Sequence, residues 1–516
     1  MDVKNPKIFL SSAALILAIA LNGCSATGSY SSFKTNRKIL IGNETLKIFR
    51  HEGLERRPVI VIPGIFGSRL VDSGSKKVVW GLFTSKEIVE SFSIEQFRGL
   101  DIPAAKEMID ALQAGTSSLP LAKDMIELMQ SRTLALPMAK GKTLAELRDK
   151  VVPSGVLDTV NISMLGVPIH MNGYKDMIDA LESAGYYSES SKNKDGSRYE
   201  TLFTFGYDWR RDIVDTAKEL DVFIQEKKKY LQKKYEELYG VKDYDVKFDI
   251  VAHSMGGLIA RYYLRYGGAG LPEDGTRPVV TWSGAGNIHK VIIVGTPNAG
   301  YLDAFTELVE GMVFAPGVPE IQPAVLGTFV SLYEMMPVQA MDMVVGEKNK
   351  TLDLYDPELW IKMKWGLADP KQDKVLKKIL PSVKNSGDRR EIALDHLRKC
   401  LKRASQFTDA IRFDAAPPKG VTLHLFLGES ILTNAVASVD GKTGRIKVIK
   451  QLPGDGKVTV KSAFFNEHHP GDPWPFIRSP IHWSSVTFLL AAHMGITNDP
   501  SFTINMIYTL LLGDQQ

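Results

Sequence analysis

The chain alternates short apolar runs with longer segments whose apolar residues recur at helical spacing. The short runs predict strands over residues 58–63, 202–206, 248–252, 291–295, 422–428 and 485–491. The longest helical pattern covers about 211–238, and a closing helix is predicted over 500–512, with Asp499 as its N-cap. Buried strands separated by helices indicate an α/β fold with a mostly parallel sheet.

Two long tracts interrupt this alternation, at residues 80–170 and 305–414. Both carry helical patterns, such as 106–114 and 391–404, and neither has a strong strand signal. Insertions of this size between the strands of one sheet typically cover its active edge. We therefore expect a core made of residues 51–79, 171–304 and 415–516, with two mainly helical caps inserted in it.

The first residues are typical of a targeting signal. Residues 1–23 contain an apolar run over 8–20, which is short for a hydrocarbon layer of about 30 Å. The next residues, Leu21-Asn22-Gly23-Cys24, resemble a bacterial lipobox. We expect a lipid on Cys24, a tether with leading strands over 24–50, and a lipid-anchored protein of the bacterial cell envelope, at the outer membrane or periplasmic face. The alternative is a plain secretory signal.

Composition excludes several classes of protein. Hydrophobic residues make up 44% and charged residues 24%, as in soluble globular proteins. The 63 Lys and Arg residues nearly balance 59 Asp and Glu residues, so no nucleic-acid partner is expected. Only Cys24 and Cys400 are present, which excludes a disulfide-dense fold and argues against a thiolate zinc site.

A nucleophile motif follows the predicted strand over 248–252. The sequence continues with His253-Ser254-Met255-Gly256-Gly257 and then an apolar helix. Strand, sharp turn and helix form the context of a nucleophile elbow, in which the serine hydroxyl stands above the sheet. Ala252 replaces the usual Gly before this turn. The Met255 N–H, at the helix start, is a candidate oxyanion donor. The alternative is an ordinary turn that contains a serine.

A second oxyanion donor is expected from another loop. Residues 63–68, Pro-Gly-Ile-Phe-Gly-Ser, follow the first predicted strand, where such a loop belongs. Gly64 and Gly67 would let the chain turn so that the Ile65 N–H faces Ser254. The alternative is a glycine-rich turn without a catalytic role.

Several motifs resemble one known family, in its order, from about residue 57 onward. They are Val61-Ile62-Pro63-Gly64, Tyr207-Asp208-Trp209-Arg210, His253-Ser254-Met255-Gly256, Val294-Gly295-Thr296-Pro297-Asn298-Ala299-Gly300, Tyr333-Glu334-Met335-Met336-Pro337, Leu354-Tyr355-Asp356-Pro357 and Gly454-Asp455-Gly456-Lys457-Val458. The chain thus resembles the lecithin:cholesterol acyltransferase family. The resemblance implies an α/β-hydrolase fold and lipid-ester chemistry. Departures are Ala252, Lys457 where Thr is usual, and the lack of a counterpart to the family's lid disulfide.

The acid and the base should follow Ser254 in that order. Asp455, between two glycines, matches the family's acid position. A hairpin turn is its alternative reading, and Asp440 is the competing carboxylate. His493 follows the last predicted strand and is the predicted base, whereas His482 precedes that strand and is the second choice. His424 is expected to be structural, and His468-His469 to lie in a solvated turn rather than on a metal.

These residues predict a two-step acyl transfer. His493 would take the Ser254 proton, Asp455 would orient the imidazole, and the acyl-enzyme would pass to water or an alcohol. The expected substrate is a lipid ester, such as a membrane phospholipid or another acyl lipid, and no metal or cofactor is needed. The alternatives are an esterase for soluble or polymeric esters and a lipid-binding lipoprotein without activity. The sequence leaves the oligomeric state open.

Overall fold

The computed structural model describes residues 53–54, 56–81, 131–164, 167–191, 198–313, 320–467 and 477–512. The chain divides into two units, Met1–Arg56 and Arg57–Gln516, and the fold below is that of the second. The predicted signal segment, Cys24, the tether, the helix over 106–114 and His468-His469 lie outside the described residues.

A six-stranded parallel sheet forms the centre of the fold, in the order β14-β11-β9-β8-β1-β7. Its strands are β1 (Val59–Ile62), β7 (Leu202–Thr204), β8 (Phe248–His253), β9 (Ile288–Val294), β11 (Thr422–Gly428) and β14 (Ser485–Leu489). Every residue of β1 and β8 is buried. The six predicted strands and the predicted α/β-hydrolase fold are therefore confirmed.

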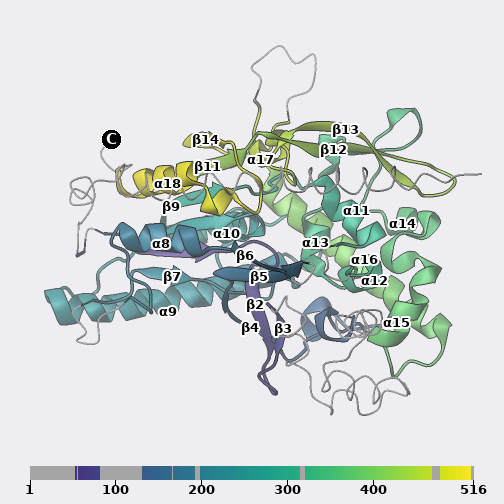
Figure 1. Cartoon of the computed structure of the whole chain (residues 1–516), viewed down its shortest axis with the longest axis horizontal. Coiled ribbons are helices and arrows are strands. Elements are labelled where there is room, and N and C mark those ends of the chain that lie inside the picture. The colour runs from purple at the N-terminus through teal and green to yellow at the C-terminus, as the bar shows by residue number, and fades with distance from the viewer. Residues whose placement is uncertain are drawn as a thin grey trace, which may run out of the picture. The chain divides into compact units, whose positions relative to one another are not determined.

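Helices α8 (Lys175–Ser183) and α18 (Pro500–Leu512) lie side by side against this sheet (Figure 1). Their apolar side chains join sheet residues in one buried cluster, which includes Met177, Leu181, Val251, Ile292, Phe426, Phe502 and Met506. The predicted helix over 500–512 is confirmed, and Asp499 accepts from the N–H groups of Ser501 and Phe502. The sequence pattern thus located the last element of the core.

The long helix α9 (Ile213–Tyr239) packs against α10 (Met255–Tyr266), which follows β8. Asp212 begins α9 by accepting from the Val214 N–H at 2.8 Å, and Gly240 ends it in a left-handed conformation. The predicted helix over about 211–238 is confirmed.

The first insertion differs from the expectation of a mainly helical cap. In its described part, β4 (Val151–Val156) joins β2 (Ser68–Asp72) and β3 (Val78–Trp80) in an antiparallel sheet, and β5 (Thr159–Met164) pairs with β6 (Val167–Asn172). The helical prediction is wrong for these residues. Because β4 is largely solvent-accessible and contains Pro153 and Gly155, it lacks the apolar signal of a buried strand.

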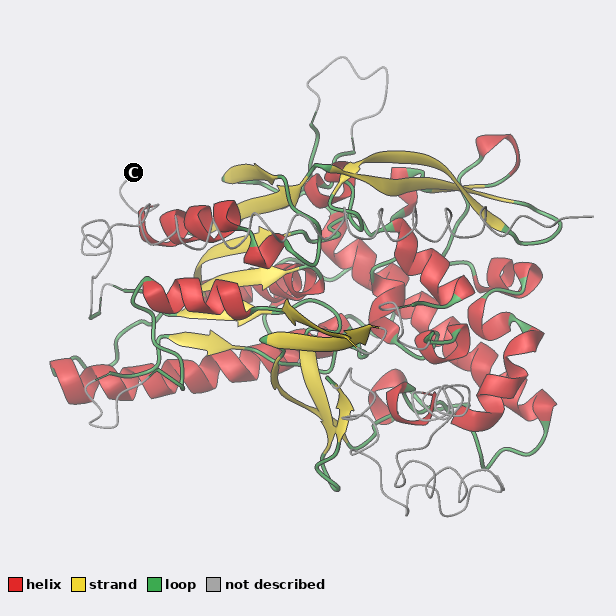
Figure 2. Cartoon of the chain, in the orientation of Figure 1, coloured by secondary structure: helices red, strands yellow, loops and turns green. Residues whose placement is uncertain are grey.

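The second insertion is helical, as predicted, and its helices gather beyond the end of the sheet (Figure 2). It contains α11 (Leu302–Glu310), α12 (Pro323–Leu326), α13 (Val330–Glu334), α14 (Pro357–Met363), α15 (Asp373–Ile379) and α16 (Ser386–Arg412). The short strand β10 (Val344–Val345) pairs with an unpredicted hairpin of β12 (Ile431–Val439) and β13 (Ile446–Gly454). Helix α17 (Val460–Phe464) follows this hairpin.

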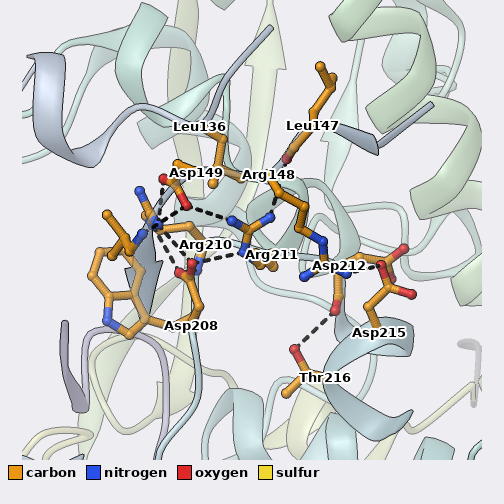
Figure 3. Close-up of polar contacts among 12 residues, drawn as sticks. Leu136, Leu147, Arg148, Asp149, Asp208, Arg210, Arg211, Asp212, Asp215 and Thr216 are labelled. Atoms are coloured by element: carbon orange, nitrogen blue, oxygen red, sulfur yellow. Dashed lines mark hydrogen bonds and ion pairs between the residues drawn. The ribbon is translucent and has the colours of Figure 1, made fainter. Parts of the chain in front are cut away.

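A buried charge cluster ties the first insertion to the core (Figure 3). The guanidinium of Arg210 is wholly buried and donates to both carboxylate oxygens of Asp208, at 2.9 and 2.8 Å. It also contacts the Asp149 carboxylate and donates to the Leu134 carbonyl at 3.0 Å. Burial alone raises the pKa of Asp208, but the charges of Arg210 and Arg211 hold that pKa below its usual value. The Tyr-Asp-Trp-Arg motif is therefore structural here.

Asp208→Asn should lower the free energy of unfolding by about 3 kcal/mol, because it leaves a buried guanidinium with less counter-charge. Glu391→Gln, which breaks the exposed ion pair with Lys140, should cost less than about 1 kcal/mol. Urea unfolding of both variants measures the difference. Equal losses would mean that the buried cluster adds no stability.

Candidate active site

Ser254 occupies a sharp turn between β8 and α10. Its backbone has φ 52° and ψ −124°, a conformation that non-glycine residues rarely adopt. The turn requires close approach of the helix to β1, since a Cβ on Gly256 would lie 2.7 Å from the carbonyl oxygens of Ile62 and Pro63. The Ser254 N–H donates to the Val294 carbonyl at 2.8 Å, which fixes the turn to β9. This is the geometry of a nucleophile elbow.

The structure brings Ser254, His493 and Asp455 into one hydrogen-bonded chain. His493 Nε2 lies 3.0 Å from Ser254 Oγ, and His493 Nδ1 lies 2.8 Å from Asp455 Oδ2. All three residues are buried, with at most 9% of their surface exposed. Ser254 directly follows β8, Asp455 directly follows β13, and His493 lies in the loop after β14.

The Asp455 carboxylate is held in place by its own loop. Its Oδ1 accepts from the N–H groups of Lys457 at 2.9 Å and Val458 at 2.7 Å, which leaves Oδ2 for His493. Burial alone raises the pKa of Asp455, but His493 and the two N–H groups together hold that pKa below its usual value. Asp455 therefore stays ionised beside the imidazole.

The competing residues lie elsewhere. Asp440 begins the turn between β12 and β13, where its carboxylate accepts from the N–H groups of Lys442 and Thr443. His482 is exposed, and its Nε2 lies 2.6 Å from Asp414. His424, on β11, lies 2.7 Å from Ser485 Oγ. Within the described part of the chain, the hydrogen bonds of these three side chains go to groups other than Ser254.

The loop after β1 lies directly against the serine. A Cβ on Gly64 would be 2.8 Å from Ser254 Cβ, so only glycine fits there. Ile65 follows in the same turn, and Met255 begins α10, at the positive end of its dipole. In the part of the chain that the structure describes, neither the Ile65 nor the Met255 N–H donates to another protein group. Their oxyanion role stays a prediction.

A known family matches the middle part of the chain. The family model described as lecithin:cholesterol acyltransferase matches residues 157–374, from the end of the first insertion through Ser254 into the second insertion. Over this range the chain is similar to that family, and its fold is that of an α/β-hydrolase. The matched range ends before Asp455 and His493, which the fold brings back to Ser254.

A solved structure described as the crystal structure of the Tle4-Tli4 complex is also similar to this chain. The TM-score is 0.47 at 13% sequence identity, and the match covers 89% of this chain and 99% of that chain. This similarity is too low to transfer a function. The search of curated proteins found no significant match.

Two further searches concern the described residues alone. Among them, no three His, Cys, Asp or Glu side chains are grouped as ligands for a metal ion. Within the same ranges, no helix combines the length and apolar character that a membrane crossing requires.

An ion-pair cluster that the sequence analysis did not predict joins the acid loop to the second insertion. Lys457 Nζ lies 3.1 Å from Asp303 Oδ2 and 2.8 Å from Glu307 Oε1, both on α11. Burial raises the pKa of Glu307, although Lys457 opposes that rise. Lys457, the residue that departs from the family's usual Thr, thus holds α11 beside the loop of Asp455.

Lys457→Met should lower Tm by about 1 °C at pH 8, for a loss of about 1 kcal/mol from a partly exposed pair. The loss should shrink at pH 5. The pKa of Glu307 is raised in the folded protein. Its favourable contribution to the free energy of unfolding is therefore largest at low pH, and this contribution falls as the carboxyl ionises. Removing Lys457 makes that ionised form more costly.

Calorimetry at both pH values tests this expectation, with Lys442→Met in the exposed β12–β13 turn as the control. A loss of Tm that is equal at the two pH values, or equal in the two variants, contradicts an electrostatic link through Glu307.

Proposed function

We propose that this protein is a serine acyl hydrolase or O-acyltransferase that acts on lipid esters. The observation that carries the proposal is the continuous contact from Asp455 through His493 to Ser254, with the serine on a strained elbow. The family match supports an ester of a lipid as the substrate, because the family is described by transfer of an acyl group from lecithin to cholesterol.

In the first step, Ser254 Oγ attacks the carbonyl carbon of the ester while its proton passes to His493 Nε2. Asp455 accepts a hydrogen bond from His493 Nδ1–H, which fixes the tautomer and stabilises the imidazolium. The Ile65 and Met255 N–H groups donate hydrogen bonds to the carbonyl oxygen and stabilise the negative charge that develops on it. His493 then gives its proton to the leaving alcohol as the ester C–O bond breaks.

In the second step, His493 takes a proton from water or from an acceptor alcohol, whose oxygen attacks the acyl-enzyme. The new tetrahedral centre collapses, Ser254 leaves with the proton from His493, and an acid or a new ester departs. The elbow and all three hydrogen-bonded groups are retained in this chain, which favours an enzyme over a lipid-binding protein without activity.

Turnover of a long-chain phospholipid tests this function. Ser254→Ala and His493→Ala should each lower kcat by about 10⁴-fold, as losses of triad members do. His482→Ala is the matched control and should keep most activity, because His482 is exposed and bonded to Asp414. More than a tenth of wild-type turnover in Ser254→Ala would refute the assignment of the nucleophile.

The same assay separates lipid esters from soluble esters. The wild-type rate should rise sharply as the substrate concentration passes its critical micelle concentration. Saturation below that concentration, with higher kcat/KM for short monomeric esters, would identify an esterase for soluble substrates.

We further propose that Cys24 carries the lipid that anchors the protein in the bacterial cell envelope. The support is the sequence Leu21-Asn22-Gly23-Cys24 after an apolar run. Cys24→Ala, after cleavage of its signal, should move from the membrane fraction to the soluble fraction in high salt. Retention in the membrane fraction would mean that another surface is the anchor.

A further inference from the structure

A chain of buried hydrogen bonds runs behind the catalytic groups, from the loop after β1 to the backbone of the base. The Gly64 N–H donates to Tyr174 Oη at 2.7 Å, and Tyr174 Oη lies 2.9 Å from His253 Nδ1. His253 Nε2 lies 3.2 Å from the carbonyl oxygen of His493. Tyr174 and His253 are both buried, with 6% and 4% of their surface exposed.

The donors and acceptors of this chain can be arranged in one way. The Gly64 N–H can only donate and the His493 carbonyl can only accept. The single proton of Tyr174 Oη must then be given to His253 Nδ1, and His253 must carry its own proton on Nε2. Burial lowers the pKa of His253 to about 3, which keeps the ring neutral as this arrangement requires, and burial raises the pKa of Tyr174.

Both ends of this series of hydrogen bonds lie beside the groups of the proposed reaction. Gly64 lies against Ser254 and precedes Ile65, whose N–H is the proposed oxyanion donor. At the other end, the backbone of His493 is held on two sides, because its N–H donates to the Asp455 carbonyl at 2.8 Å and its carbonyl accepts from His253. A shift of either end would change the distance between the oxyanion donors and the base.

We propose that Tyr174 and His253 are positioning residues. Through their hydrogen bonds, which we call the Tyr174–His253 relay, they fix the oxyanion loop and His493 relative to each other. The inference rests on the proposed function of Ser254, His493 and Asp455. The hydrogen bonds of Tyr174 and His253 reach the Gly64 N–H and the His493 carbonyl, and the His253 ring also packs against the His493 ring with centroids 5.0 Å apart.

Tyr174→Phe tests the proposal, because it removes the hydroxyl and keeps the ring. The matched control is Tyr207→Phe. Tyr207 is also wholly buried, and its hydroxyl donates to the carbonyl of Pro63, next to Gly64, at 2.7 Å. Each variant thus loses one buried tyrosine hydroxyl that bonds the same loop, but only Tyr174 bonds His253.

Tyr174→Phe should lower kcat by about 10–100-fold with little change in KM, since a misplacement of about 1 Å can cost that much. Tyr207→Phe should lose less than about threefold in kcat for a similar loss of Tm, because its loss leaves the link to His493 intact. Equal losses of kcat in the two variants, or an unchanged kcat in Tyr174→Phe, would overturn the relay.

A pair of changes at His253 tests the other half of the relay and remains informative if Tyr174→Phe does not fold. The amide nitrogen of Gln reaches the region of His Nε2, whereas that of Asn reaches only the region of Nδ1. His253→Gln should therefore keep the bond to the His493 carbonyl and retain more kcat than His253→Asn. The reverse ranking contradicts the relay.

Failure of the relay can be told apart from failure of the proposed function. If Ser254→Ala is inactive while Tyr174→Phe and Tyr207→Phe behave alike, the nucleophile stands and the relay is wrong. If Ser254→Ala retains turnover, the assignment of the active site is wrong, and the relay that rests on it falls as well.

Discussion

The positive φ of Ser254 is the constraint on which the rest of the site depends. A serine in that conformation makes the turn so sharp that α10 packs directly against the end of β1. Only glycine fits at position 256, because a Cβ there would clash with the carbonyl oxygens of Ile62 and Pro63. The strain is sustained because β8 and α10 are wholly buried on either side of the turn. The hydroxyl is thereby held at the carboxyl edge of the sheet, where the other loops arrive.

Close backbone packing at this edge continues on the side of the acid and the base. A Cβ on Gly428, at the end of β11, would lie 2.5 Å from the Ala491 carbonyl and 2.7 Å from Asp455 Cβ. The loops that carry Asp455 and His493 can therefore approach each other only because β11 ends in glycine. Parallel strands bring their carboxyl ends to one edge, so loops that are far apart in sequence become neighbours there.

Much of this arrangement could be read from the sequence because its signals are local. The apolar runs of β1 and β8 and the elbow after β8 each lie within about ten residues, and the order of acid and base follows from the fold class. The hairpin of β12 and β13 was missed, since most of β13 is exposed and carries no apolar pattern. Its turn contains Asp440, while Asp455 follows its second strand.

Long-range polar pairs gave no signal in the sequence. Tyr174 is 79 residues from His253 and 110 residues from Gly64 along the chain. A single tyrosine in the sequence does not indicate which distant groups it will bond. Lys457 was noticed only as a departure from the family, and its ion pairs with α11 depend on how the second insertion folds back. The sequence thus indicated Ser254, Asp455 and His493, and the structure adds the groups that hold them in place.

The central claim is that Ser254 is a nucleophile activated by His493. Reaction with a fluorophosphonate that forms a covalent bond to activated serines, followed by mass spectrometry of the digested protein, tests it most directly. The account predicts one adduct, on the peptide that contains Ser254, formed far more slowly in His493→Ala and at nearly the normal rate in His482→Ala. An adduct on another residue, or labelling of Ser254 that does not depend on His493, would contradict it.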